Sequence, residues 1–121
     1  AQSIRNFQGN LQALKLISMA QARNKDFASA LETAKNISDL RVRADALETI
    51  AVQQVKAGDH SVALATAQLI DNPYRRSDAE VDIALTRSQM GDLEGGLKIA
   101  RSLSTKLGQS LALTKIAQSL P

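Results

Sequence analysis

The sequence predicts an all-α protein in which antiparallel helix pairs recur with a 33-residue period and stack side by side. Three observations lead to this prediction. Apolar side chains recur at steps of three and four residues, which marks one face of a helix. No segment alternates apolar and polar residues with the period of two that is typical of strands. A 33-residue shift aligns the chain with itself, so that similar residues fall into the same column.

The aligned columns are the most regular feature of the chain. Alanine recurs at two positions of the repeat, isoleucine or leucine at three, and aspartate at one. Because so many coincidences at one shift are not expected by chance, equivalent positions should have equivalent surroundings. The columns hold Ala1, Ala34, Ala67 and Ala100; Ile4, Ile37, Ile70 and Leu103; Ala13, Ala46, Ala79 and Ala112; Ile17, Ile50, Ile83 and Ile116; Leu31, Leu64 and Leu97; and Asp26, Asp59 and Asp92.

Each repeat is expected to contain two helices joined by a short turn. Gly58 closes the first helix of one pair, because glycine adopts the left-handed conformation of a helix C-terminus without steric cost. Asp59 follows it and caps the second helix by accepting hydrogen bonds from free backbone amides. The same dipeptide recurs one repeat later as Gly91 and Asp92, and in the first copy we expect Asn24 to take the place of the glycine.

The apolar spacing and these turns set the expected boundaries. Pro73 prevents a helix from continuing through it and so separates two repeats. Residues 1–6 are expected to form the tail of a preceding second helix. The helix pairs cover residues 10–38, 43–71 and 76–104 of one domain, 1–121, with helices at 10–23, 27–38, 43–57, 60–71, 76–90, 93–104 and 109–120.

Composition excludes several classes of protein. Hydrophobic residues make up 44% and charged residues 22% of the 121 residues, as in an average soluble globular domain. The chain has no cysteine and one histidine, so we expect no disulfide, metal site or cofactor. No apolar stretch approaches the ~20 residues of a membrane span. The net charge of +3 is too small to indicate nucleic-acid binding, and the composition fits a cytoplasmic or an exported protein equally well.

The two ends of the chain differ from its middle. One helix pair cannot bury its apolar face alone, so about three or more repeats must stack to form a core. The first unit begins in mid-helix, and the final helix still carries Leu111, Leu113, Ile116 and Leu120. We therefore expect the chain to be part of a longer array, or to associate with itself through its terminal repeats.

The repeat resembles the tetratricopeptide repeat over nearly the whole chain. The likeness departs from the family in its period, which is 33 where the family has 34, and in lacking bulky aromatic residues along the first helix. It implies a right-handed superhelix whose concave groove is lined by the first helix of each pair. The residues that carry it are Leu47, Ile50, Ala51, Gly58, Asp59, Ala63, Leu64, Ala67, Ile70 and Pro73, matched again by Ala79, Ile83, Ala84, Gly91, Asp92, Leu97 and Ala100.

A non-enzymatic interaction scaffold is the function that this resemblance implies. The mixture of apolar and charged residues on the expected groove suits an amphipathic helix or an extended peptide of a partner protein. No nucleophile with a neighbouring base, metal-ligand set or phosphate-binding loop suggests an enzyme. The groove residues implied by the resemblance are Gln12, Lys15, Met19, Arg23, Asp45, Glu48, Val52, Lys56, Asp78, Val81, Leu85, Ser88 and Gln89.

Two alternatives remain open. The terminal helices could join copies of the chain into a structural scaffold. A basic edge along the loops between repeats could instead bind RNA, phosphate or an acidic peptide, although neighbouring aspartates reduce its field and make nucleic acid the weaker choice. The basic edge consists of Arg41, Arg43, Arg75, Arg76 and Lys106.

Three polar or unusual features are expected to be structural. His60 replaces Phe27 and Leu93 of the other copies and should pack between paired helices. Glu80 and Arg87 replace leucine and glutamine on one helical face, and should form a partly exposed polar pair. The Gly95–Gly96 dipeptide lies where alanine is found in other copies, so a close helix contact should explain it.

Overall fold

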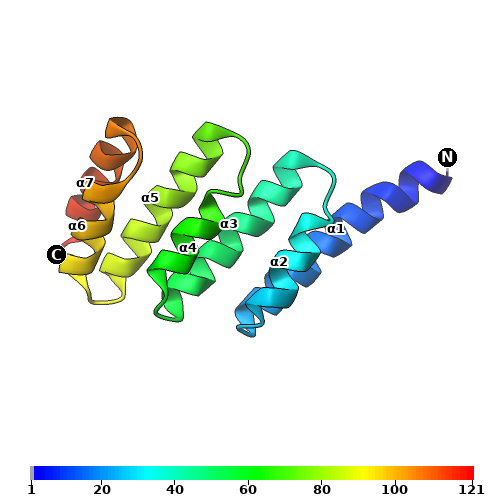
Figure 1. Cartoon of the computed structure of the whole chain (residues 1–121), viewed down its shortest axis with the longest axis horizontal. Coiled ribbons are helices and arrows are strands. Elements are labelled where there is room, and N and C mark those ends of the chain that lie inside the picture. Colours follow the sequence, from blue (N-terminus) through cyan, green and yellow to red (C-terminus); the bar gives the residue numbers. More distant parts are fainter. Residues whose placement is uncertain (1) are drawn as a thin grey trace.

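A computed structural model describes the backbone of residues 2–121 and the side chains from residue 10 onward. Over this range the protein is all-α, as predicted, with no strand. Figure 1 shows its helices in a row of pairs, with the two ends of the chain at opposite ends of the row. The helices are α1 (Gln2–Arg23), α2 (Phe27–Lys35), α3 (Leu40–Lys56), α4 (His60–Ala67), α5 (Pro73–Gln89), α6 (Leu93–Ser102) and α7 (Lys106–Ser119).

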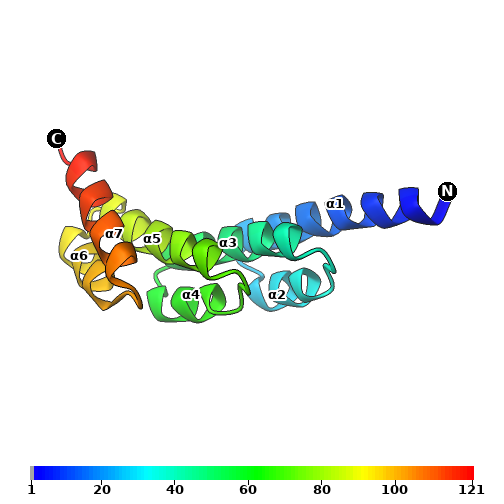
Figure 2. The same cartoon turned by 90° about the horizontal axis from the view of Figure 1, so that it is seen from above.

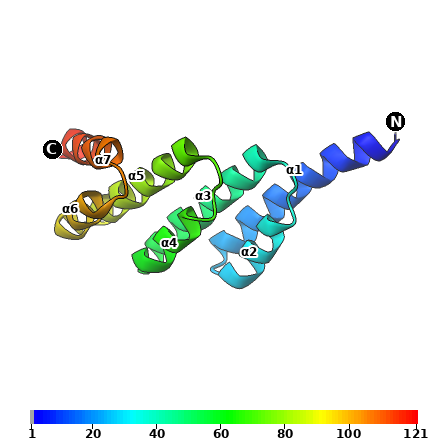
Figure 3. The ribbon, with the colours of Figure 1, turned by 45° about the horizontal axis from the view of Figure 1, so that its top comes forward.

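Contacts between helices are confined to neighbours in the chain. Within the described residues, each helix packs only on helices one or two places away, such as α3 on α1, α2, α4 and α5. Figure 2 shows α1, α3 and α5 along one side of the row and α2, α4 and α6 along the other, and Figure 3 shows the successive pairs side by side. Both ends of the row bend toward the side of α1, α3 and α5 (Figure 2).

The residues that cap the helix N-termini recur at the 33-residue spacing of the repeat. Asp26, Asp59 and Asp92 cap α2, α4 and α6, each accepting a hydrogen bond from the backbone amide three residues later. A second series of caps begins α3, α5 and α7 with Asp39, Asn72 and Thr105. The side-chain oxygens of these six residues accept from free amides of the first turn, which stabilises each helix start.

The turns follow the prediction at the glycines but not in the first copy. Gly58 and Gly91 have φ of 94° and 95°, in the left-handed region that favours glycine. In the first copy this conformation is adopted by Lys25, with φ of 65°, and not by Asn24. The expectation for Asn24 was therefore wrong, because the position just before the capping aspartate is the one that reverses the chain.

The first helices of the later pairs begin three residues earlier than predicted, at Leu40, Pro73 and Lys106. The reason is the second series of caps, which the apolar spacing does not reveal. Pro73 does not break a helix, because it occupies the first turn of α5, where its missing amide would have no partner. The second helices end earlier than predicted, at Lys35, Ala67 and Ser102.

The expected break after residue 6 is absent, since the backbone from Gln2 to Arg23 forms one helix. No proline interrupts this stretch, and a single glycine inside a helix costs only about 1 kcal/mol. The prediction that residues 1–6 belong to a separate helix was therefore wrong for residues 2–6, and residue 1 lies outside the described residues.

The aligned alanine and isoleucine columns form much of the core, and Leu31, Leu64 and Leu97 are half-buried and pack against it. Ala34, Ala67 and Ala100 are fully buried, and so are Ala46, Ala79 and Ala112. Ile50 and Ile83 are 0% exposed and Ile116 is 1% exposed, whereas Ile17 of α1 is 48% exposed. Position 17 differs because α3, α5 and α7 each have a preceding helix pair to pack against, and the described residues give α1 none.

A recurring hydrogen bond from a side chain to a backbone carbonyl stabilises the loops between repeats. The Arg43 Nε donates to the Ile37 carbonyl oxygen over 2.8 Å, and the Arg76 Nε donates to the Ile70 carbonyl oxygen over 3.0 Å. Gln109 repeats the contact with its Nε2, donating to the Leu103 carbonyl oxygen over 2.8 Å. These carbonyls belong to loop residues whose side chains are buried, so the bond satisfies a backbone acceptor at each repeat boundary.

The glycine pair in α6 has two different causes. A β-carbon at Gly96 would lie 2.7 Å from the Ser88 Cβ and 2.9 Å from the Ala84 carbonyl oxygen, so the expected close contact with α5 is present there. A β-carbon at Gly95 would lie 2.3 Å from the Asp92 Oδ2. Gly95 is therefore explained by the capping aspartate and not by a helix contact.

The isoleucine column gives a matched stability test. Ile50→Ala should lower the free energy of unfolding by about 2–4 kcal/mol, because it opens a cavity in the core. Ile17→Ala, at the equivalent but exposed position, should change it by about 0.5 kcal/mol or less. Urea denaturation of both variants measures the difference, and similar losses at both positions would contradict the packing described for α1.

The left-handed turns give a second test. Lys25→Gly should raise the free energy of unfolding by about 0.5–1 kcal/mol, because glycine adopts this conformation without the steric cost that a side chain incurs. Gly58→Ala should lower it by about 1 kcal/mol, although no neighbouring atom lies within 4 Å of the added β-carbon. Thermal denaturation should show the two melting temperatures moving in opposite directions, and a shared direction would contradict the assignment.

Candidate binding surface on α1, α3 and α5

The residues expected to line a groove all lie on α1, α3 and α5, and nearly all reach the surface. Their exposure divides them into two groups, with one exception. Gln12, Arg23, Lys56, Asp78 and Gln89 are exposed, whereas Lys15, Met19, Asp45, Glu48, Val52, Leu85 and Ser88 are half-buried. Val81 is only 2% exposed and belongs to the core, so including it in a groove was wrong.

Charged side chains connect the three helices of this surface. The Lys15 Nζ of α1 lies 3.7 Å from the Asp45 Oδ2 of α3. From α5, the Arg75 guanidinium binds the Asp45 carboxylate and also lies 3.9 Å from the Glu48 Oε2. Consecutive repeats therefore contribute to one network of charged side chains across this surface.

Glu48 has an unusual protonation equilibrium. Its pKa is raised from 4.5 to about 7, first by burial and then by the neighbouring carboxyl of Asp82, which acts through a hydrogen bond and through its charge. The Arg75 guanidinium lowers this pKa, and the Asp78 charge raises it. Burial and a neighbouring like charge both disfavour the ionised form of Glu48.

Apolar side chains lie beside the charged network. A hollow in the surface of α3 is lined by Glu48, Thr49, Val52 and Gln53. Met19 of α1 and Leu85 of α5 are half-buried on the flanking helices. The surface therefore offers an apolar strip next to a group of carboxylates, and this combination can accommodate the side chains of an amphipathic ligand.

Two contributors to this surface were missed by sequence reasoning. Asp82 was not selected, although it lies one helical turn after Asp78 and could have been placed on the same face from that spacing alone. Arg75 was assigned to the basic edge, whereas it pairs with carboxylates of α3. Its long side chain crosses from α5 to α3, which a helical register cannot show.

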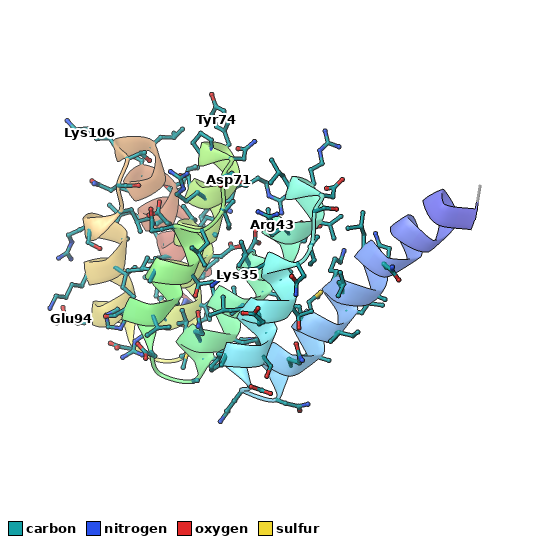
Figure 4. The ribbon with its side chains drawn as sticks, turned by 45° about the vertical axis from the view of Figure 1, so that its right-hand side comes forward. Lys35, Arg43, Asp71, Tyr74, Glu94 and Lys106 are labelled. Atoms are coloured by element: carbon teal, nitrogen blue, oxygen red, sulfur yellow. The ribbon has the colours of Figure 1, made fainter. Side chains whose placement is uncertain are left out.

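The basic edge is largely used within the fold. Arg43 and Arg76 bind loop carbonyl oxygens, and Arg75 binds Asp45. Arg41 and Lys106 are exposed. Figure 4 shows Arg43 and Lys106 along the edge where α3 and α7 begin, together with Asp71 and Tyr74, while Glu94 lies toward the opposite edge.

Glu80 and Arg87 do not form the partly exposed pair that was expected. Glu80 is 4% exposed, and its carboxylate accepts from the Gln68 Nε2 at 3.0 Å and from the Ser104 Oγ at 3.1 Å. Arg87 donates through its Nε to the Asp92 Oδ2 at 2.9 Å. The expectation was wrong because Glu80 and Arg87 have closer partners on the three loops that hold Gln68, Ser104 and Asp92.

The same positions of the earlier copies show what Arg87 replaces. The Thr33 Oγ1 donates to the Gln21 Oε1 over 2.8 Å, and the Thr66 Oγ1 donates to the Gln54 Oε1 over 2.6 Å. In the third copy Arg87 stands at the glutamine position and Ile99 at the threonine position. Because Ile99 offers no hydroxyl, Arg87 binds the capping aspartate, Asp92, instead. The hydrogen bonds from the Gly95 amide and from the Arg87 guanidinium together lower the pKa of Asp92.

His60 is half-buried and lines a hollow between α4 and α6 together with Leu64 and Arg87. Within the described side chains, no three His, Cys, Asp or Glu residues are grouped so that they could hold a metal ion. None of the helices described over residues 2–121 has the length and apolarity needed to cross a membrane.

Comparison with known proteins adds no relative to these observations. No family model, curated protein or solved structure matches the chain.

The Glu48 carboxyl predicts a pH-dependent stability. Its pKa is raised in the folded state, so folding retains a proton that the unfolded chain releases above about pH 4.5. The contribution of Glu48 is complete below pH 4.5 and is lost as the pH rises through 7. We expect a loss of about 1–2 kcal/mol between pH 4.5 and 8, reduced from the full shift because the side chain is 30% exposed.

The matched variant is Glu48→Gln, which cannot ionise. Its free energy of unfolding should equal that of the wild type near pH 4.5 and exceed it at pH 8. Denaturant titrations across this range measure the stability, and carbon-detected NMR of the Glu48 carboxyl measures its titration. A carboxyl that titrates near its ordinary pKa would contradict the packing of Glu48 against Asp82.

Proposed function

We propose that this chain is a right-handed, tetratricopeptide-like α-solenoid that binds a peptide or helix of a partner protein on the surface of α1, α3 and α5. The confinement of contacts to neighbouring helices supports the architecture, as do the caps and loop bonds that recur at the spacing of the repeat. We propose no reaction for this surface: the protein acts as an interaction scaffold.

The observation that carries the proposal is the network that joins three repeats beside an apolar strip. Lys15, Asp45, Glu48 and Arg75 belong to three different helices, so no single helix pair contains this surface. Folding does not require charged bridges of this kind, since exposed pairs contribute only about 0–1 kcal/mol. A shared, fixed surface is what recognition of an extended ligand requires.

The composition of the surface favours a basic amphipathic ligand. Asp45, Glu48, Asp78 and Asp82 outnumber the two cations that approach them, Lys15 and Arg75. A ligand cation near Glu48 would replace the proton that Glu48 holds below about pH 7, and it would therefore bind more tightly at pH 8 than at pH 5. Apolar ligand groups would cover Met19, Val52 and Leu85.

A matched pair of variants tests the surface. Peptides selected from a random library for binding to the purified chain should bind Val52→Glu at least about 10-fold more weakly than the wild type, because the substitution replaces the apolar side chain of this hollow with a charge. Met19→Glu and Leu85→Glu should act in the same way. Fluorescence anisotropy with labelled peptides gives the dissociation constants.

The control is Val62→Glu, the same substitution on α4, where Val62 is exposed on the opposite side of the row. It should leave the affinity unchanged. If selected peptides bind Val52→Glu and the wild type equally, or if Val62→Glu weakens binding as much, the proposed surface is wrong.

A further inference from the structure

The hollow between α4 and α6 is a second candidate site. It has a volume of about 330 Å³ and lies between two helices of the α2, α4 and α6 side of the row (Figure 2). Leu64 and Ile99 contribute apolar groups to its wall, and Ser61 and Ser102 contribute hydroxyls. Its basic side chains are His60, Arg87 and Lys98.

The basic residues of this hollow depart from the repeat. One period earlier, around α2 and α4, their equivalents are Phe27, Gln54 and Ala65, none of which carries a charge. The helices there are paired and capped in the same way as α4 and α6, so folding does not require the basic residues. The charges are therefore a property of this one place in the row.

Arg87 also replaces a hydrogen bond that the earlier copies use. Gln21 and Gln54 each accept from a threonine of the following helix, and Arg87 with Ile99 cannot make this bond. A guanidinium has five N–H donors, and Asp92 accepts from the Nε of Arg87. Its two Nη atoms have no hydrogen-bond partner among the described residues, so they can bind a further acceptor.

The basic residues give the hollow an excess of positive charge. The Gly95 amide and the Arg87 guanidinium lower the pKa of Asp92. The charge of His60 lowers it further, which places His60 near the Arg87–Asp92 pair. Lys98 has no salt bridge among the described side chains. Asp92 therefore balances only one of the two permanent cations.

We propose that this hollow binds a phosphomonoester, whose phosphoryl group lies among Arg87, Lys98 and His60 while its organic part covers Leu64. A phosphomonoester carries a charge of about −2 and three acceptor oxygens at neutral pH, which matches several converging donors. The free edge of a guanidinium binds two phosphate oxygens at once. A carboxylate has one charge and two oxygens, so it would leave donors of the hollow without a partner. The hollow shares no residue with the surface of α1, α3 and α5.

Phenyl phosphate, added to the wild-type chain at pH 8, tests the proposal first. In two-dimensional NMR the backbone amide signals of His60, Gly95 and Lys98 should shift to saturation, with a dissociation constant of about 1 mM or lower. Phenyl sulfate has a similar shape and a single charge, so it should bind at least about 5-fold more weakly. No shift of these signals up to about 10 mM phenyl phosphate, or equal binding of the two esters, would overturn the proposal.

A double variant removes the site and restores the repeat. Arg87→Gln with Ile99→Thr gives the third copy the residues of the first two, so it should regain the hydrogen bond between glutamine and threonine. The melting temperature should stay close to that of the wild type, while phenyl phosphate should bind at least about 10-fold more weakly. Lys98→Ala, which introduces the residue found at position 65, should weaken binding by at least about 3-fold.

The matched control is Lys35→Ala, which removes the same charge from an exposed position of α2 outside the hollow. It should bind phenyl phosphate like the wild type. If Lys35→Ala weakens binding as much as Lys98→Ala, or if the double variant binds like the wild type, the site is wrong. None of these substitutions changes a residue of the α1, α3 and α5 surface, so peptide binding there can fail or succeed independently.

A phosphoserine tripeptide with blocked ends distinguishes the two sources of such a group. Tighter binding of this peptide than of phenyl phosphate would support a phosphorylated segment of a protein as the ligand. Tighter binding of phenyl phosphate would support a small phosphorylated molecule. If neither compound binds, the proposal is overturned.

Discussion

The burial of each first helix between the pair before it and the pair after it is the constraint on which the structure depends. Ala46 and Ile50 of α3 lose their contact with water because α1 and α2 precede them, and Ala51 loses its own because further helices follow. The same residue type is therefore buried in the middle of the row at Ile50 and Ile83 and exposed at Ile17 of α1.

Hydrogen bonds at the repeat boundaries make this packing specific. A hydrophobic face alone would tolerate a shift of one helix turn along its neighbour. The caps at Asp39 and Asn72 fix where α3 and α5 begin, and Arg43 and Arg76 then bind the loop carbonyls that immediately precede those helices. Each of these bonds satisfies a backbone group that would otherwise lie near the core without a partner, so a misplaced repeat would lose several of them together.

The carboxylates of the α1, α3 and α5 surface differ from the buried carboxylate of the core. Glu80, buried in α5, has two donors and needs no ligand. Glu48 instead lies beside the Asp82 carboxyl, which raises its pKa, and 3.9 Å from the Arg75 guanidinium, which lowers it. Folding keeps this arrangement at a free-energy cost that increases with pH, and a basic partner would remove that cost. This contrast indicates a structural role for Glu80 and supports the proposed binding of a ligand beside Glu48.

The sequence by itself determined the helical class, the period of the repeat, the buried columns and the caps at Asp26, Asp59 and Asp92. These are local or periodic properties, and a pattern of residue types is sufficient to specify them. The tertiary structure decided everything that depends on which side chains reach across a helix boundary. Arg43 and Arg76, which the sequence suggested as a ligand-binding edge, bind loop carbonyls, and Arg75 crosses to α3. Val81 and Glu80 are buried, because the exposure of a side chain depends on the neighbouring helices as well as on its residue type. A long flexible side chain can reach several hydrogen-bond partners, and the positions of the neighbouring helices determine which partner it binds.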